Sequence, residues 1–179
     1  MRAVLDANVL FPTILREILI DLAGAGLFVP LWSPRILAEW RGAAARLGGD
    51  QGAVAGAEIA LLRDRFPAAE MPDDGNRAID LHFPDPADRH VVEAALAGAA
   101  TLVVTANLRD FPQTLMAGLG LRAIHPDAFL LDLFRSDPGA VRAAVLTTRD
   151  KAAAMGGNMT LAAMLKRSRL PRLAKALKG

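Results

Sequence analysis

Three polar side chains follow the ends of apolar runs that are typical of buried β-strands. Asp6 ends the run at residues 2–5, and Asn107 and Asp110 follow the run at residues 101–105. In an open parallel sheet, ligands bind at the carboxyl ends of the strands, so we expect these side chains at one edge. Asp6 could instead cap the following helix and Asp110 could lie in an ordinary turn. An acid that closes an apolar first strand favours a catalytic role for Asp6.

Two further acids stand at the start of a predicted helix. Asp85 is in the N-cap position, Pro86 is the first helical residue, and Asp88 lies in the first turn. A capping role explains Asp85. Asp88 could be only a first-turn acid that the helix dipole favours. Because this helix leads into the strand at 101–105, we expect Asp88 at the opposite edge of the sheet. It would lie at the same edge as Asp6 if the helix ran antiparallel to the usual crossover or began close to that edge.

Glu39 borders the apolar face of a helix that starts at Ser33-Pro34. The apolar residues of this helix fall within an arc of about a hundred degrees, and Glu39 lies roughly sixty degrees outside it; they are Ile36, Leu37, Trp40, Ala44 and Leu47. A carboxylate at this boundary can point along the surface into a cleft. It can equally be an ordinary surface glutamate.

If several of these acids meet, their repulsion requires either protonation or a cation. Two carboxylates about 4 Å apart repel by roughly 4 kcal/mol at an effective dielectric constant of about 20. The chain has no cysteine and three histidines, so oxygen ligands favour Mg²⁺ or Mn²⁺ over Zn²⁺. None of His82, His90 and His125 has the i, i+4 partner of a zinc site, and we expect structural roles for them. A hard divalent ion can activate water against a phosphodiester.

Strands that alternate with helices must position these groups. We predict strands at 2–5, 27–31, 101–105 and 121–124, with a possible short strand at 77–80; helices are predicted at 9–27, 33–47, 51–65, 85–97 and 112–118. This alternation favours a three-layer α/β/α fold with a central parallel sheet. Residues 127–178 are predicted to be helical, with breaks at Pro138, Gly156-Gly157 and Pro171.

Length and composition favour one packed domain with a small appendage. Of the 179 residues, 53% are hydrophobic and 22% are charged, which excludes a disordered or collagen-like chain. The N-terminal sequence lacks the features of a secretory signal, and no apolar run reaches the length of a membrane span. We therefore expect a cytoplasmic protein without a membrane partner.

Positive charge is concentrated in the last 29 residues of the chain. They contain seven basic side chains and no acid, although the net charge of the whole chain is only +2. This asymmetry indicates an anionic partner, either nucleic acid or protein, for Lys166, Arg167, Arg169 and Arg172. The alternative is that these residues only solubilise a terminal helix.

Four segments together resemble PIN-domain ribonucleases. They are LeuAspAlaAsnValLeu at 5–10, Glu39 in the second long helix, AspProAlaAspArgHisValValGluAlaAla at 85–95 and LeuValValThrAlaAsnLeuArgAspPhePro at 102–112. The last two blocks are the most specific. The resemblance covers residues 1–130 as a nuclease domain, and residues 131–179 resemble the helical C-terminal extension of some toxins of the VapC type. It implies that the conserved acids meet in one cleft.

The resemblance also implies a role for each acid. Asp6, Glu39 and Asp88 take the three core acidic positions. Asp6 and Asp88 would ligate the metal, and Glu39 would ligate it or activate the attacking water. Asn107 stands where many members carry an aspartate, and Asp110 follows one helical turn later as the other candidate ligand.

Two polar residues match supporting positions of the family, namely Asn8 and Thr105. The function that the resemblance implies is a Mg²⁺- or Mn²⁺-dependent endoribonuclease, the toxin of a toxin–antitoxin pair. A small antitoxin protein would occlude its cleft, and homodimers are usual in the family.

Other functions are compatible with parts of the pattern. The chain could be an RNA-processing nuclease without an antitoxin, or a catalytically weak PIN-fold module that binds RNA or protein, because Asn107 supplies no charge. A haloacid-dehalogenase-like phosphatase also begins with an aspartate after its first strand. It needs a second aspartate two residues later, where this chain has Asn8.

Overall fold

The computed structural model of the chain describes residues 1–75, 77–157 and 159–178. They form two compact units. The first contains Met1–Phe11 and Phe28–Ile124, and the second contains Pro12–Leu27 and His125–Gly179. The division into a domain of residues 1–130 and an extension of residues 131–179 stays a prediction, since the second unit also takes in Pro12–Leu27.

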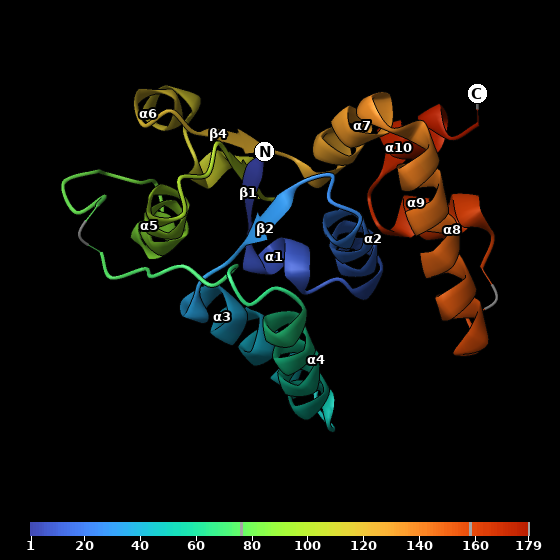
Figure 1. Cartoon of the computed structure of the whole chain (residues 1–179). Helices are drawn as coiled ribbons and strands as arrows, with labels where there is room; N and C mark the ends of the chain where they lie inside the picture. Colours follow the sequence, from blue (N-terminus) through green and yellow to red (C-terminus); the bar gives the residue numbers. More distant parts are fainter. Residues whose placement is uncertain (76, 158, 179) are drawn as a thin grey trace. The chain divides into compact units, whose positions relative to one another are not determined.

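A four-stranded parallel sheet forms the centre of the first unit (Figure 1). Its order is β2-β1-β3-β4, and the strands are β1 (Arg2–Leu5), β2 (Val29–Leu31), β3 (Leu102–Val104) and β4 (Arg122–Ile124). Val4 of β1 pairs with Leu31 on one side and with Val103 on the other. Pro30 is tolerated because β2 is an edge strand. The predicted α/β fold with a parallel sheet is confirmed.

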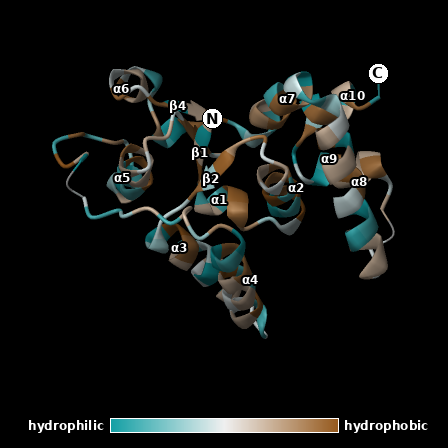
Figure 2. Cartoon of the chain, in the orientation of Figure 1, coloured by the Kyte–Doolittle hydropathy of each residue, from teal (hydrophilic) through white to brown (hydrophobic). Residues whose placement is uncertain are grey.

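Short helices and turns connect the strands of the first unit. They are α1 (Ala7–Leu10), α3 (Pro34–Ala45), α4 (Gln51–Arg65), α5 (Arg89–Ala97) and α6 (Gln113–Gly118), with the 3-10 turns η1 (Pro86–Asp88) and η2 (Leu108–Asp110). α5 contacts β1 and β3, and α3 packs against α4. Figure 2 shows strongly apolar residues along the strands and α1, where the core of this unit lies.

Capping residues act as their positions predict. Ser33 accepts a hydrogen bond from the backbone N–H of Ile36 at the start of α3, and Asp85 accepts one from Ala87 at the start of η1. Both side chains satisfy amide groups that the first helical turn leaves without a partner.

Two local predictions were wrong. The helix predicted at 9–27 is interrupted at Phe11-Pro12, because Pro12 adopts an extended conformation before α2 (Thr13–Gly24). Residues 77–80 form turns and no strand. The buried carboxylate of Glu93 accepts the backbone N–H groups of Arg77 and Ala78, which a neighbouring strand would otherwise bind.

The second unit is helical throughout its described secondary structure. Besides α2 it contains α7 (Pro126–Ser136), α8 (Pro138–Ala154), α9 (Leu161–Arg167) and α10 (Pro171–Ala176). Asp127 is buried and accepts hydrogen bonds of 3.0 Å from the backbone N–H groups of Arg172 and Leu173. Its carboxylate therefore caps α10. Among the described residues, no helix is both long and apolar enough to cross a lipid bilayer.

Candidate active site

Asp6 lies directly after β1, and the neighbouring strand fixes its backbone. Its N–H donates to the carbonyl oxygen of Val104 in β3 at 3.1 Å. The side chain is only 5% exposed. It stands at the N-cap position of α1, but its carboxylate bonds to Asn8 and Thr105. The loops after β1 and β3 therefore meet at this side chain, as the sheet order predicts.

A hydrogen-bond network holds the Asp6 carboxylate. Oδ2 of Asp6 accepts from the Thr105 hydroxyl at 2.7 Å and from the Asn8 amide at 2.5 Å. Asn8 also contacts the loop after β3, because its Oδ1 accepts a hydrogen bond from the Ala106 N–H at 2.9 Å. Thr105 also accepts from Asn107 N–H at 3.0 Å. Burial raises the pKa of the Asp6 carboxyl, and the hydrogen bonds from Thr105 and Asn8 act against that rise.

Asp88 is electrostatically coupled to Asp6, so it lies at the same edge of the sheet. Burial, followed by the charges of Asp6, Asp110 and Asp85, raises the pKa of the Asp88 carboxyl to about 7. The expectation of the opposite edge was wrong. A helix that leads into a parallel strand must return the chain to the start of that strand, so its first turn lies at the carboxyl edge.

The side chain of Asp110 contacts Asp88, and the side chain of Asn107 contacts Asp110. A side-chain hydrogen bond between Asp88 and Asp110 contributes to the raised pKa of Asp88. The Asn107 amide donates to Asp110 Oδ2. Of the two candidates for the fourth position, Asp110 is therefore the one in contact with an acid of the core set, and Asn107 orients it.

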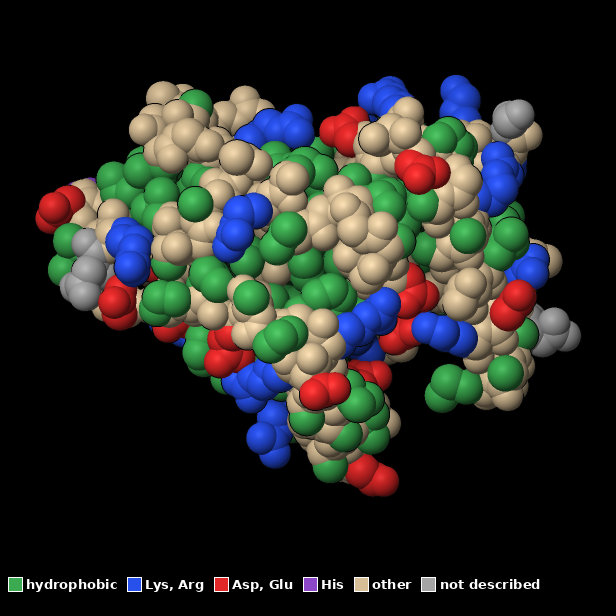
Figure 3. All heavy atoms as spheres, in the orientation of Figure 1, with side chains coloured by type: hydrophobic (Ala, Val, Ile, Leu, Met, Phe, Trp, Pro, Cys, Tyr) green, Lys and Arg blue, Asp and Glu red, His purple; other side chains and the backbone are tan. Residues whose placement is uncertain are grey.

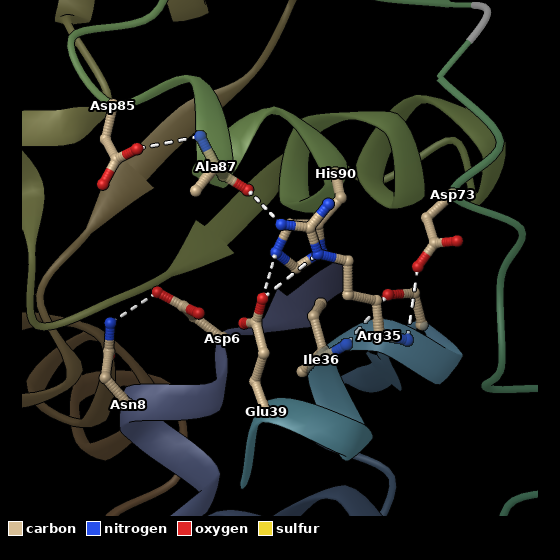
Figure 4. A network of polar contacts seen from close by, with 10 residues as sticks. Asp6, Asn8, Arg35, Ile36, Glu39, Asp73, Asp85, Ala87 and His90 are labelled. Atoms are coloured by element: carbon tan, nitrogen blue, oxygen red, sulfur yellow. Dashed lines mark hydrogen bonds and ion pairs between the residues drawn. The ribbon is translucent and has the colours of Figure 1, made fainter. Parts of the chain in front are cut away.

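Glu39 reaches the site from α3 (Figure 4). Its Oε1 accepts from Arg35 Nε at 3.2 Å and lies 3.1 Å from His90 Nε2. Burial, with smaller contributions from the charges of Asp6 and Asp73, raises the pKa of the Glu39 carboxyl, while Arg35 lowers it. The carboxylate is thus part of the same electrostatic group as Asp6.

His90 is a neutral partner of Glu39. The side chain is buried, and burial together with the Arg35 charge lowers its pKa to about 4. The contact with Glu39 is therefore not an ion pair at neutral pH. Neither ring nitrogen has a hydrogen bond of good geometry to the described residues, so we interpret the 3.1 Å approach as a close polar contact.

The chemistry of these donors fits a hard divalent cation. The core groups are carboxylates. Burial is the largest cause of the raised pKa values of Asp6, Glu39 and Asp88, and neighbouring acidic charges add to the rise for Glu39 and Asp88. A cation would relieve this repulsion. Within 1–75, 77–157 and 159–178, no three His, Cys, Asp or Glu side chains already stand close enough together to hold a metal ion.

The family model described as "PIN domain" matches residues 2–109, which is more than half of the chain. The chain belongs to the PIN-domain family. The matched segment includes Asp6, Glu39 and Asp88 and ends one residue before Asp110.

One curated relative of this PIN-domain chain is named "Putative ribonuclease VapC50", from Mycobacterium tuberculosis (strain ATCC 25618 / H37Rv). The two sequences are 41% identical over 69 residues, which are 38% of this chain and 39% of the relative. The chain thus spans about two fifths of the length of the curated relative that it matches. No solved structure matches this PIN-domain chain significantly.

The remaining candidate residues lie in the second unit of the PIN-domain chain. Lys166, Arg167, Arg169 and Arg172 are exposed on α9, after it and on α10. Figure 3 shows several basic side chains over these C-terminal helices. His125 caps α7, because its Nδ1 accepts from Asp127 N–H at 3.2 Å.

Sequence reasoning missed the contacts that Arg35 and His90 make with Glu39. The contact between Arg35 and Glu39 could have been predicted, since Arg35 precedes Glu39 by four residues on a helix and such pairs share a face. The contact between His90 and Glu39 could not, because these residues come from helices far apart in the sequence.

Proposed function

We propose that this PIN-domain chain is a divalent-metal-dependent endoribonuclease that hydrolyses RNA phosphodiester bonds. The observation that carries the proposal is the proximity of Asp88 to Asp6 and Asp110: burial, followed by the charges of these acids, raises the pKa of Asp88 to about 7. Asp6, Asp88 and Asp110 come from three separate segments near the carboxyl edge of the sheet, where α/β proteins bind their ligands. The name of the curated relative supports RNA as substrate.

The side chains have distinct roles in this mechanism. Asp6, Asp88 and Asp110 would hold Mg²⁺ or Mn²⁺, with Asn8 and Thr105 orienting Asp6 and Asn107 orienting Asp110. Such an ion supplies charge neutralisation for a phosphodiester and lowers the pKa of water. Glu39 accepts the proton of the attacking water, because its raised pKa brings the carboxylate closer to the range of an effective general base.

Cleavage of structured RNA by the purified full chain tests the proposal. We expect Mn²⁺-dependent cleavage by the wild type and its loss in Asp6→Asn and Asp88→Asn, which keep the size of the side chain and remove a charge. A chelator should stop the reaction. Equal cleavage by the wild type and both variants would show that another site, or a contaminant, is responsible.

We further propose that the chain is the toxin of a toxin–antitoxin pair, acting in the cytoplasm as a homodimer. The support is the VapC name of the relative. A short open reading frame directly upstream, whose product binds the chain and blocks cleavage, is the expected finding. An isolated gene would favour an RNA-processing nuclease instead.

A catalytically weak binding module is the second candidate, and Asn107 is the observation that favours it. An amide stands where a further carboxylate would strengthen the site, and it engages Asp110. RNA binding without cleavage at any Mn²⁺ concentration would support this alternative.

A further inference from the structure

Arg35 links the helix that carries Glu39 to the turn that carries Asp88. Its Nε donates to Glu39 Oε1 at 3.2 Å, one turn along α3. Its Nη2 donates to the carbonyl oxygen of Ala87 in η1, also at 3.2 Å. One guanidinium thus joins segments 52 positions apart in the sequence (Figure 4). The group is planar and its donors have fixed spacing, so the two bonds restrict the relative position of the segments.

Ala87, the residue that precedes Asp88, is held through both of its backbone polar groups. Its N–H donates to Asp85 Oδ1 at 2.8 Å, while its carbonyl oxygen accepts from Arg35. The peptide group between Ala87 and Asp88 is also held at its N–H, which donates to the carbonyl oxygen of Asp85 at 3.1 Å. Because Asp88 follows Ala87 directly, these bonds restrict the position of the backbone that carries its side chain. The Asp85 bond only caps the turn. The position of the turn relative to α3 depends on the bond from Arg35.

The start of α3 is fixed by separate contacts. Ser33 Oγ accepts from Ile36 N–H at 3.2 Å, and Asp73 Oδ2 accepts from the backbone N–H of Arg35 at 3.3 Å. These bonds satisfy the first amide groups of the helix. The backbone of Arg35 is therefore held in place, so its side chain can restrict the positions of Glu39 and Ala87.

Among residues 1–75, 77–157 and 159–178, the contacts given for the Glu39 carboxylate use only one of its oxygens. The Arg35 and His90 contacts both fall on Oε1. Oε2 takes part in neither, so this oxygen remains for a metal ion or a water. A surface ion pair would normally contribute little to stability, and Arg35 is half exposed. We therefore infer that Arg35 acts on the relative positions of Glu39 and Asp88 and contributes little to stability.

We propose that Arg35 is a positioning residue, which sets the separation between Glu39 and Asp88 by bridging Glu39 to the Ala87 carbonyl. The inference rests on the proposed metal-dependent function. It assigns Arg35 no contact with substrate.

Arg35→Lys tests the bridge, because lysine keeps the charge and lacks the planar fork that spans both acceptors. Arg41→Lys is the matched control, since Arg41 is exposed on the same helix. In the full chain, we expect Arg35→Lys to weaken Mn²⁺ binding about tenfold, as loss of a residue that orients metal ligands does. We also expect lower kcat for RNA cleavage with unchanged KM. The control should stay within about twofold of wild type.

Arg35→Gln separates positioning from simple charge. Removing a cation beside the acids would tighten Mn²⁺ binding if only charge mattered. Positioning predicts weaker binding instead. Wild-type affinity in Arg35→Lys, or tighter binding in Arg35→Gln, would overturn the proposal.

The bridge also has a readout without metal. The Nε–H signal of Arg35 in a nuclear magnetic resonance spectrum should shift in Glu39→Gln, and an unchanged signal would show that the bridge is absent. If the wild type binds no Mn²⁺, the proposed function fails, while this signal still decides the contact. Thermal unfolding of Arg35→Lys should stay close to wild type, because the side chain is half exposed.

Discussion

The hydroxyl group of Thr105 donates a 2.7 Å hydrogen bond to Asp6 Oδ2, and both side chains are buried. This bond lowers the pKa of a carboxyl that burial raises. Thr105 therefore helps to keep Asp6 ionised, which a metal ligand requires.

Thr105→Val should raise the pKa of Asp6 further, because it removes that donor while conserving the shape of the side chain. We expect a loss of about 1 kcal/mol in the free energy of unfolding and weaker Mn²⁺ binding. Thr105→Ser, which retains the hydroxyl, is the control. Nuclear magnetic resonance titration of the Asp6 carboxyl would measure the effect, and identical titrations for valine and serine variants would exclude this role.

The metal-free protein should lose stability as the pH rises from about 4 to about 7. The folded-state pKa of Asp88 is raised from 3.8 to about 7, so the folded state binds the proton more tightly than the unfolded state. The stabilising effect of that proton is complete below the unfolded pKa and is lost through the folded pKa. Denaturant unfolding of Asp88→Asn should show a flatter pH dependence in this window. Parallel curves for the two proteins would contradict the coupling.

Added Mn²⁺ should reverse this loss at pH 7.5. A ligand that binds only the folded state at a hundred times its Kd adds about 2.7 kcal/mol of stability. We expect a rise in Tm for the wild type and little change in Asp6→Asn or Asp88→Asn. An equal rise in all three proteins would place the ion elsewhere.

The fourth acidic position can be decided by paired substitutions. Asp110→Asn should lower the pKa of Asp88, since it removes a like charge, and should weaken Mn²⁺ binding. Asn107→Asp should do the opposite in both measurements, because it adds a carboxylate beside Asp110. Calorimetric titration with Mn²⁺ distinguishes them. If Asp110→Asn binds as the wild type does, Asp110 is not a ligand.

The basic residues of the C-terminal helices should make RNA binding depend more steeply on salt. Replacing Lys166, Arg167, Arg169 and Arg172 by glutamine should reduce the slope of log K against log salt by up to about 3, or roughly 0.7 for each contact to a single strand. Substitution is preferable to truncation, since Leu165, Leu170 and Leu173 are buried. Equal slopes for the wild type and the variant would show that these residues do not contact RNA phosphates and only solubilise the helices.

Local signals predicted most of the elements of this chain. The apolar run at 101–105 contains buried β3, and the Ser-Pro pair begins α3. The sequence also indicated that Leu47 belongs to the apolar face of α3, but the helix ends at Ala45 and Leu47 is 68% exposed. Periodicity cannot show where a helix stops when the first terminating glycine, Gly48, follows three residues after the last helical residue.

The site was predictable only in part. Asp6 follows from its position after a strand, whereas the Asp88 position required the direction of α5, which is a property of the whole sheet. The link from Arg35 to Ala87 depends on tertiary packing and leaves no periodic signal. Periodic patterns therefore miss contacts of this kind, which join the acidic side chains to segments far away in the sequence.

The bond between Asp6 and Thr105 also has a consequence for biosynthesis. The two residues are 99 positions apart, and β1 gains β3 as a partner only after the ribosome has made the whole segment between them. The acidic centre is thus among the last parts of the first unit to be completed. A growing polypeptide that already contains Asp6 therefore lacks the Thr105 bond until β3 has been synthesised, and the proposed RNA cleavage would be delayed until then.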